Sequence, residues 1–234
     1  MILLHHQRKP PHAPASARLR AFLRAHREAG LLLYWIPYLI WFGLLELVEL
    51  PQHGISCALD AYIPFNVWFA IPYFSWFAAL FLSLAYYLLR DRETFENLCF
   101  LMFSGMTAAL VVYTFWPMSI DVRVPLEGGG PIYGAVRALQ GFDSPRNVCP
   151  SIHVSSSLAI AVAVSMGPAL PGGRKAKAAV WVWMALICAS TVLIKQHSLI
   201  DVFWGAVITA VLSVVTYRLD WRAALRRTPL RAFL

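Results

Sequence analysis

The stretch that decides the fold is residues 97–120, NLCFLMFSGMTAALVVYTFWPMSI, which runs for 24 residues without a charged side chain. About 20 apolar residues in a helix suffice to cross the hydrocarbon core of a bilayer. Further runs of this kind lie within 29–45, 61–89, 147–173, 178–194 and 202–217. They are continuously apolar instead of alternating with period two, which favours helices over a membrane barrel. The sequence therefore predicts an all-α polytopic membrane protein, a bundle of six transmembrane helices.

The composition agrees with a membrane protein. Of the 234 residues, 59% are hydrophobic and 14% are charged, whereas soluble domains carry about 25% charged residues. The net charge of +8 is spread between the apolar runs and does not mark one soluble face, so we expect no nucleic-acid partner. No Cys-x-x-Cys pair occurs among the four cysteines, which argues against a disulfide framework or a cysteine zinc site. No obligate protein partner is evident.

The distribution of basic residues predicts the topology. With a cytoplasmic N-terminus, 16 of the 20 Lys and Arg residues fall on the inner side, as the positive-inside rule requires. Only Arg123, Arg137, Arg146 and Lys195 fall outside. We therefore expect a multi-pass protein of the cell membrane with both termini cytoplasmic. The predicted organisation is a basic tail over 1–29, a membrane domain over 30–219 and a second basic tail over 220–234. Residues 16–27 could form an amphipathic surface helix or belong to a disordered tail.

Two polar clusters interrupt the apolar pattern at the predicted outer face, where polar groups are functional candidates. In the first cluster, His197 and Asp201 are four residues apart near the start of the sixth span. If the helix begins near His197, both side chains share one face, and the carboxylate can fix the imidazole tautomer and raise its basicity. This arrangement fits an oriented nucleophile or base, and the alternative reading is a helix-start pair without chemistry.

The second cluster is Pro150-Ser151-Ile152-His153, at the start of the fourth span. Proline suits the first position of a helix, and the free N–H groups of such a helix start bind anions well. His153, in the same first turn, is either a proton donor or a packed core histidine. Arg123, Arg146 and Lys195 are cations on the same side, and such groups bind phosphate. Together these residues suggest phosphoryl transfer.

These segments resemble the signatures of the type-2 phosphatidic acid phosphatase superfamily. Pro150-Ser151-Ile152-His153 is similar to the second signature, usually Pro-Ser-Gly-His, and His197-x-x-x-Asp201 is similar to the third. The resemblance covers residues 65–217. In the first signature only Arg123-Val124-Pro125 remains, the family's Lys falls on Trp116, and the Arg of the third signature falls on Thr191. Pro-Ser-Ile-His with Gln-His-x-x-x-Asp is closer to the inositol phosphotransferase-like branch, which leaves water or an alcohol as the acceptor.

The resemblance implies a metal-independent reaction without a cofactor, on a lipid phosphate at the outer face. His197 would attack phosphorus, Asp201 would support His197, and His153 would protonate the leaving oxygen. Arg123, Ser151 and Lys195 would bind the non-bridging oxygens. We thus expect a lipid-phosphate phosphatase, with a lipid phosphotransferase as the alternative. Two further readings are a metal-dependent hydrolase with His153, His197 and Asp201 as ligands and a small transporter.

Overall fold

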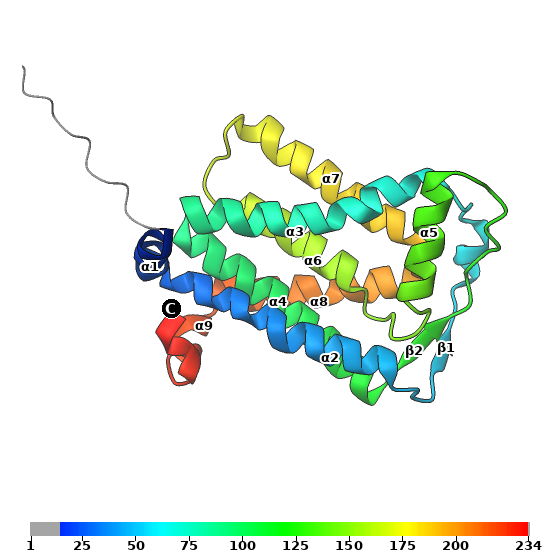
Figure 1. Ribbon diagram of the computed structural model, residues 1–234, viewed down its shortest axis with the longest axis horizontal. Helices are drawn as coiled ribbons and strands as arrows, with labels where there is room; N and C mark the ends of the chain where they lie inside the picture. Colours follow the sequence, from blue (N-terminus) through cyan, green and yellow to red (C-terminus); the bar gives the residue numbers. More distant parts are fainter. Residues whose placement is uncertain (1–14, 234) are drawn as a thin grey trace, which may run out of the picture.

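The computed structural model describes residues 15–233, and its regular elements are almost all helical (Figure 1). The long helices are α2 (Trp35–Leu47), α3 (Ala70–Arg90), α4 (Arg92–Phe115), α6 (Ile152–Met166), α7 (Gly173–Leu193) and α8 (Leu199–Arg218). Shorter α-helices are α1 (Ala15–Ala25), α5 (Pro131–Phe142) and α9 (Trp221–Leu225). The 3₁₀-helices are η1 (Arg27–Tyr34), η2 (Ala58–Tyr62), η3 (Val67–Phe69) and η4 (Pro229–Phe233).

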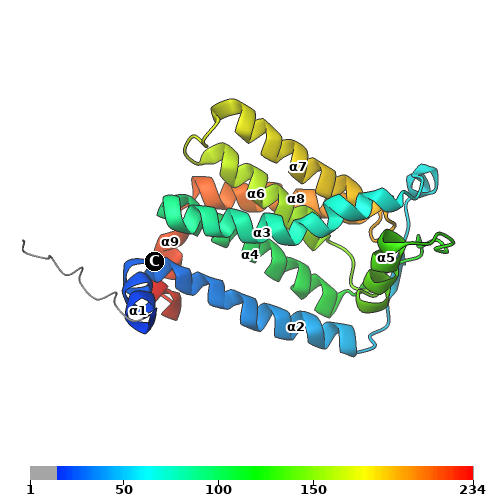
Figure 2. The same ribbon diagram turned by 45° about the horizontal axis from the view of Figure 1, so that its top comes forward.

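Helix α6 is the centre of the bundle and packs against α4, α7 and α8 (Figure 2). Its sequence, IHVSSSLAIAVAVSM, is rich in serine and alanine, and small residues let membrane helices approach closely. Polar contacts join it to its neighbours. Ser156 Oγ accepts a hydrogen bond from Trp76 Nε1 on α3 at 2.8 Å, and the Ser155 carbonyl accepts one from Thr209 Oγ1 on α8 at 3.1 Å.

Five helical segments in the described part of the chain are long and apolar enough to cross a membrane. They are Arg27–Leu47, Val67–Arg90, Arg92–Phe115, Gly173–Leu193 and Leu199–Arg218, and the shorter apolar helix Ile152–Met166 joins them. The all-α membrane bundle is therefore confirmed.

The helix of the fifth span is longer than the expected range, whereas α6 lies within the range expected for the fourth span. The fifth was expected over 178–194, but α7 begins at Gly173 and takes in the basic residues before Val180. Lys177 Nζ caps the end of α6 by donating to the carbonyls of Ser165 and Gly167, at 3.1 and 3.0 Å. The charge-based boundary was wrong because long basic side chains tolerate a place inside a helix when they reach polar partners. The short helix is α6, with 15 residues.

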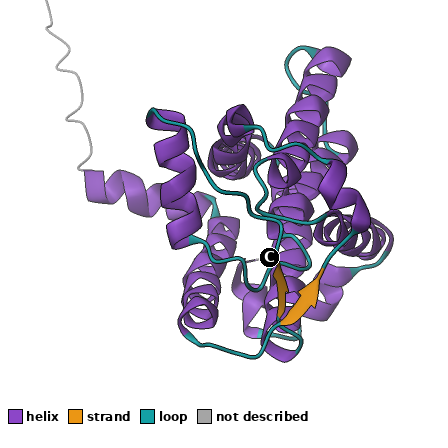
Figure 3. Ribbon diagram, turned by 90° about the vertical axis from the view of Figure 1, so that its right-hand side faces the viewer, coloured by secondary structure: helices purple, strands orange, loops and turns teal. Residues whose placement is uncertain are grey.

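The two ends of the bundle differ in structure. At one end lie α5 and a two-stranded parallel sheet, in which β1 (His53–Ile55) pairs with β2 (Met118–Ile120) (Figure 3). At the other end lie α1, α9 and η4, close to the last described residue (Figure 1). The sequence left a surface helix or a disordered tail open for residues 16–27, and the structure has a helix, α1, over most of that range. Residues 1–14 of the predicted N-terminal tail lie outside the described residues.

Candidate functional site

The start of α8 brings His197 and Asp201 together. His197 Nδ1 lies 3.2 Å from Asp201 Oδ2, and the two side chains are 8% and 0% exposed. The same oxygen accepts the backbone N–H of Ser198 at 2.9 Å, in a capping box at the helix N-terminus. When Nδ1 donates to the carboxylate, the imidazole is held in one tautomer with Nε2 unprotonated. The arrangement can therefore present an oriented nucleophilic nitrogen.

The sequence folds this loop tightly. Lys195 adopts a φ of 60°, and the Thr191 carbonyl then accepts the backbone N–H groups of both Gln196 and His197 at 3.0 Å. The helix α8 begins only at Leu199. His197 thus precedes the helix, and the expectation that the pair shares a helical face was wrong. The capping box brings the two side chains together instead.

Asp60, in η2, binds the segment between α7 and α8 through several hydrogen bonds. Its carboxylate accepts the Ser198 hydroxyl at 2.5 Å and the Leu199 N–H at 2.9 Å. Its carbonyl oxygen accepts Lys195 Nζ at 2.8 Å. An acid at a helix N-terminus is also favoured by the helix dipole. Asp60 is therefore a positioning residue that the sequence reading missed, because 138 residues separate it from Ser198.

The start of α6 contributes the second histidine. Ser151 is the N-cap, since its hydroxyl accepts the N–H of Val154 at 3.4 Å, and its own N–H donates to the Asp201 carbonyl at 3.1 Å. Pro150 stands before the N-cap, so its expected place as the first helical residue was wrong. The hydrogen bond between Ser151 and Asp201 ties the starts of α6 and α8 together. It thereby fixes where His153 stands relative to the pair on α8.

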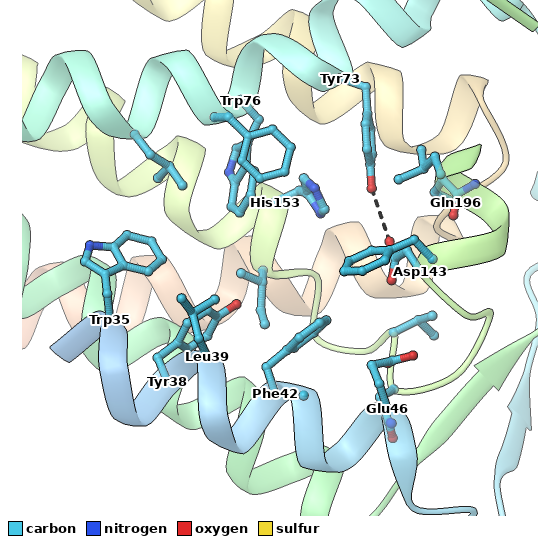
Figure 4. Close-up of a pocket in the computed structure, with 18 of the residues that line it drawn as sticks. Trp35, Tyr38, Leu39, Phe42, Glu46, Tyr73, Trp76, Asp143, His153 and Gln196 are labelled. Carbon is cyan, nitrogen blue, oxygen red and sulfur yellow. Dashed lines mark hydrogen bonds between the residues drawn. The ribbon is translucent and has the colours of Figure 1, made fainter. Parts of the chain in front are cut away.

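His153 is enclosed by aromatic rings (Figure 4). Its ring centroid lies 4.5 Å from that of Tyr73 and 4.4 Å from that of Trp76. The His197 ring lies edge-on at 5.7 Å. No hydrogen bond to the His153 ring is found among residues 15–233. Its ring nitrogens are therefore free to exchange a proton with a group bound in the site.

Both histidines line a cavity of about 1170 Å³. Its walls are apolar and come mainly from α2 and α3, including Trp35, Phe42, Leu80 and Leu84. The polar lining gathers near the histidines and consists of Glu46, Asp143, Ser144, Arg146, Asn147 and Gln196. A largely apolar cavity with polar groups near two histidines can hold an amphiphilic ligand.

The residues predicted to bind phosphate do not line this cavity. Ser151 is 0% exposed and caps α6, while Lys195 is engaged with Asp60. Arg123 donates to the carbonyls of Gln140 and Asp143, at 3.1 and 2.6 Å, and to Gln196 Oε1 at 2.7 Å. Burial lowers the pKa of the Arg123 guanidinium, with the nearby Asp143 opposing that shift. The structure thus brings the two histidines and Asp201 together and places these three residues around them.

Asp143 is the lining residue that the sequence reading missed most clearly. It follows α5, and its Oδ2 accepts the Tyr73 hydroxyl at 3.5 Å (Figure 4). Burial raises the pKa of the Asp143 carboxyl, while nearby His197 lowers it. A single acid in a long loop gives no pattern in the sequence. Its distance of ten residues from His153 was the only available signal.

A metal site was weighed for the same histidines. In the part of the chain that the structure describes, no three His, Cys, Asp or Glu side chains are grouped so that they could hold a metal ion.

The comparison with models of known protein families found a match. The model of the PAP2 superfamily matches residues 126–224, and this match confirms the resemblance to the type-2 phosphatidic acid phosphatase superfamily. The matched range contains His153, His197 and Asp201, while Arg123 precedes it. No curated protein and no solved structure matched. Members of the superfamily are phosphatases and phosphotransferases, so the match supports a phosphatase-type enzyme that acts on lipid phosphates.

Proposed function

We propose that the protein is a membrane lipid-phosphate phosphatase that works through a phosphohistidine intermediate. The observation that carries the proposal is that His153 and the Asp201-bound His197 line one apolar cavity. The lipid chain would lie between α2 and α3, with the phosphate at the histidines. Arg90 and Arg92 stand at the far ends of α3 and α4, which supports an active site at the outer membrane face.

The reaction has two steps. His197 Nε2 attacks phosphorus and forms an N–P bond, while the P–O bond to the lipid leaving group breaks. A proton from His153 neutralises the departing oxygen. In the second step His153 takes a proton from water, and the water oxygen displaces His197 from phosphorus. Both histidines then return to their starting protonation states, so no metal or cofactor is needed.

The start of α6 supplies the binding site for the non-bridging oxygens in this proposal. The backbone N–H groups of Ile152 and His153 have no acceptor among the described residues, and both residues line the cavity. Free N–H groups at the positive end of a helix bind phosphate. Arg123, Ser151 and Lys195, the earlier candidates, would then act by holding the α5–α6 and α7–α8 segments in place.

The charges of the cavity favour an alcohol as a second kind of phosphoryl acceptor besides water. Two carboxylates, Asp143 and Glu46, line its polar end, and Arg146 is the one Lys or Arg in the described lining. Arg146 Nη2 already donates to the Glu46 carbonyl at 3.2 Å. Carboxylates accept hydrogen bonds from hydroxyl groups, so an alcohol acceptor fits this wall. The alternative function is therefore a lipid phosphotransferase with the same nucleophile.

Rapid quenching with ³²P-labelled lipid phosphate tests the proposed function. We expect acid-labile, base-stable label on His197 in the purified full-length protein, together with released phosphate or an alcohol phosphate. A protein that turns lipid over without such label would disprove the covalent mechanism.

The proposed orientation has its own test. Cysteines introduced at Gly129 and Gly172 in a variant that lacks the native cysteines should react with an impermeant reagent from opposite sides of the membrane. Gly129 lies in the loop before α5, and Gly172 lies in the turn before α7. Labelling of both positions from the same side would refute the six-span topology.

A further inference from the structure

Asp143 has an unused hydrogen-bonding oxygen at the cavity. Its Oδ2 accepts the Tyr73 hydroxyl, while Oδ1 has no partner among residues 15–233. Oδ1 is also not one of the fully buried side-chain atoms without a partner in that part of the chain, so it is accessible. Asp143 lines the cavity (Figure 4), so its Oδ1 is the carboxylate oxygen available to a molecule bound there. The carboxylate can therefore accept a hydrogen bond from a molecule that enters the cavity.

Arg123 fixes Asp143 relative to the candidate nucleophile. One guanidinium holds the backbone carbonyl of Asp143 at 2.6 Å and the side chain of Gln196 at 2.7 Å. Gln196 is the residue directly before His197 and is 2% exposed. Asp143 is thus held in a set position beside His197 before any ligand binds, as specific recognition requires.

The charge of this wall selects the kind of group that can bind there. A second phosphate would bring further negative charge against Asp143 and Glu46, and like charges in a partly buried site repel strongly. A hydroxyl group has no charge and donates one hydrogen bond, which a carboxylate accepts at short distance. The Tyr73 hydroxyl already makes this kind of contact, although at a long 3.5 Å.

We propose that Asp143 and Tyr73 form a hydroxyl-binding subsite that accepts an uncharged alcohol or polyol group next to the phosphate attacked by His197. The inference rests on the proposed function, because it assumes that phosphoryl transfer occurs at His197. The hydroxyl can belong to the head group of the donor lipid or to a separate acceptor alcohol. In both cases the subsite disfavours lipid diphosphates.

Two phosphodiester lipids with matched chains test the subsite, because attack by His197 would break the P–O bond to diacylglycerol in each and leave the head-group phosphate on the histidine. Phosphatidylglycerol carries a hydroxylated head group, and phosphatidylpropanol carries one of the same length without hydroxyls. In the full-length protein, Asp143→Asn should lower the ratio of kcat/KM for the two lipids at least about tenfold, since a site built for a hydroxyl discriminates strongly. Tyr73→Phe should lower the ratio about threefold by loosening the carboxylate. Asp121→Asn, at an exposed acid outside the cavity, is the matched control.

Added glycerol separates the two sources of the hydroxyl. If the subsite binds the acceptor, Asp143→Asn should raise the glycerol concentration that gives half-maximal transfer and leave the KM of the lipid unaffected. If it binds the donor head group, the KM of phosphatidylglycerol should rise instead. Equal loss on both lipids with no change in the glycerol dependence would overturn the subsite while His197 remained labelled. A wild-type protein that neither turns over lipid nor acquires label would overturn the proposed function and the subsite together.

Discussion

At the end of the bundle that carries α1 and α9, buried carboxylates are paired with arginines, whereas at the other end Asp201 and Asp143 meet histidine, tyrosine and open space. Glu96 is 5% exposed and accepts Arg92 Nε at 2.7 Å and Arg222 Nε at 2.8 Å. Asp201 instead accepts hydrogen bonds from His197 and a backbone N–H, and Oδ1 of Asp143 has no partner within residues 15–233.

The acids paired with arginines contribute to stability, and the acids at the cavity are available for activity. The arginine pairs join the start of α4 to α9, and the neighbouring Glu28 links His26 of the N-terminal segment to Arg92. These acids have their charge neutralised, so they serve the fold. The acids at the cavity retain capacity to bind or to support a charge that develops in a reaction. Substitutions at the first end should therefore change the free energy of unfolding, and substitutions at the second should change turnover.

The largest effect is expected at His197. Because no phosphohistidine can form, His197→Ala should lose at least about 10⁴-fold in kcat on every substrate. His153→Ala should be partly rescued by an activated aryl phosphate, whose leaving group needs no proton. Steady-state kinetics on a lipid phosphate and an aryl phosphate measure both. Normal turnover in His197→Ala, or label on His153, would reverse the two roles.

Arg123 should have the next largest effect. Arg123→Ala frees the Asp143 carbonyl and the Gln196 side chain, and we expect kcat/KM to fall about 10- to 100-fold because charge-assisted contacts are lost. Arg123→Lys should recover little, since one ammonium group cannot replace the three-way guanidinium contact. The control is Arg137→Ala, whose guanidinium contacts the carbonyls of Leu126 and Gly128 and lies over the Tyr133 ring, all outside the cavity lining. An equal loss in both alanine variants would contradict the positioning role.

The close approach of α6 and α8 gives a smaller effect. A Cβ at Gly205 would lie 2.8 Å from the Ser151 carbonyl oxygen and 3.1 Å from Val154 Cβ. Gly205→Ala must therefore push apart the two helix starts that carry His153 and His197. We expect about a tenfold loss of kcat/KM and a destabilisation of about 1–3 kcal/mol.

Gly105→Ala is the matched control, because a Cβ at that position meets its nearest atom at 3.8 Å. Enzyme kinetics and thermal unfolding in the same detergent compare the two variants. If both glycines tolerate alanine equally, the packing of α6 on α8 does not control the site.

The sequence predicted the features that repeat or pair locally. Long uncharged runs gave the membrane helices, and the four-residue spacing of His197 and Asp201 gave their contact. The polar cluster at the start of the fourth span singled out His153 as a proton donor or a core residue, and the resemblance to a known family implied the first of these roles. The sequence could not predict contacts between distant segments, such as Asp60 with Ser198, because no local pattern records them. It also assigned Lys195 by charge and expected side, and the loop geometry turned that side chain toward Asp60.

The smallest effect on turnover is expected at Glu96. There a substitution should lower stability and leave turnover unchanged. Glu96→Gln removes the charge that two arginines share, and we expect the free energy of unfolding to fall by about 2 kcal/mol, since a hydrogen bond to a charged group contributes about that much. Glu93→Gln is the control, because Glu93 is exposed in the same turn and only its carbonyl contacts Arg222. Turnover per folded molecule should stay at the wild-type value in both variants, because the pairs lie at the end of the bundle away from the cavity's histidines.

Denaturant unfolding and active-site labelling in one preparation measure the stability and the turnover per folded molecule. A Glu96→Gln protein with normal stability and reduced turnover would show that the arginine pairs act on the site, and the division between the two ends would fail.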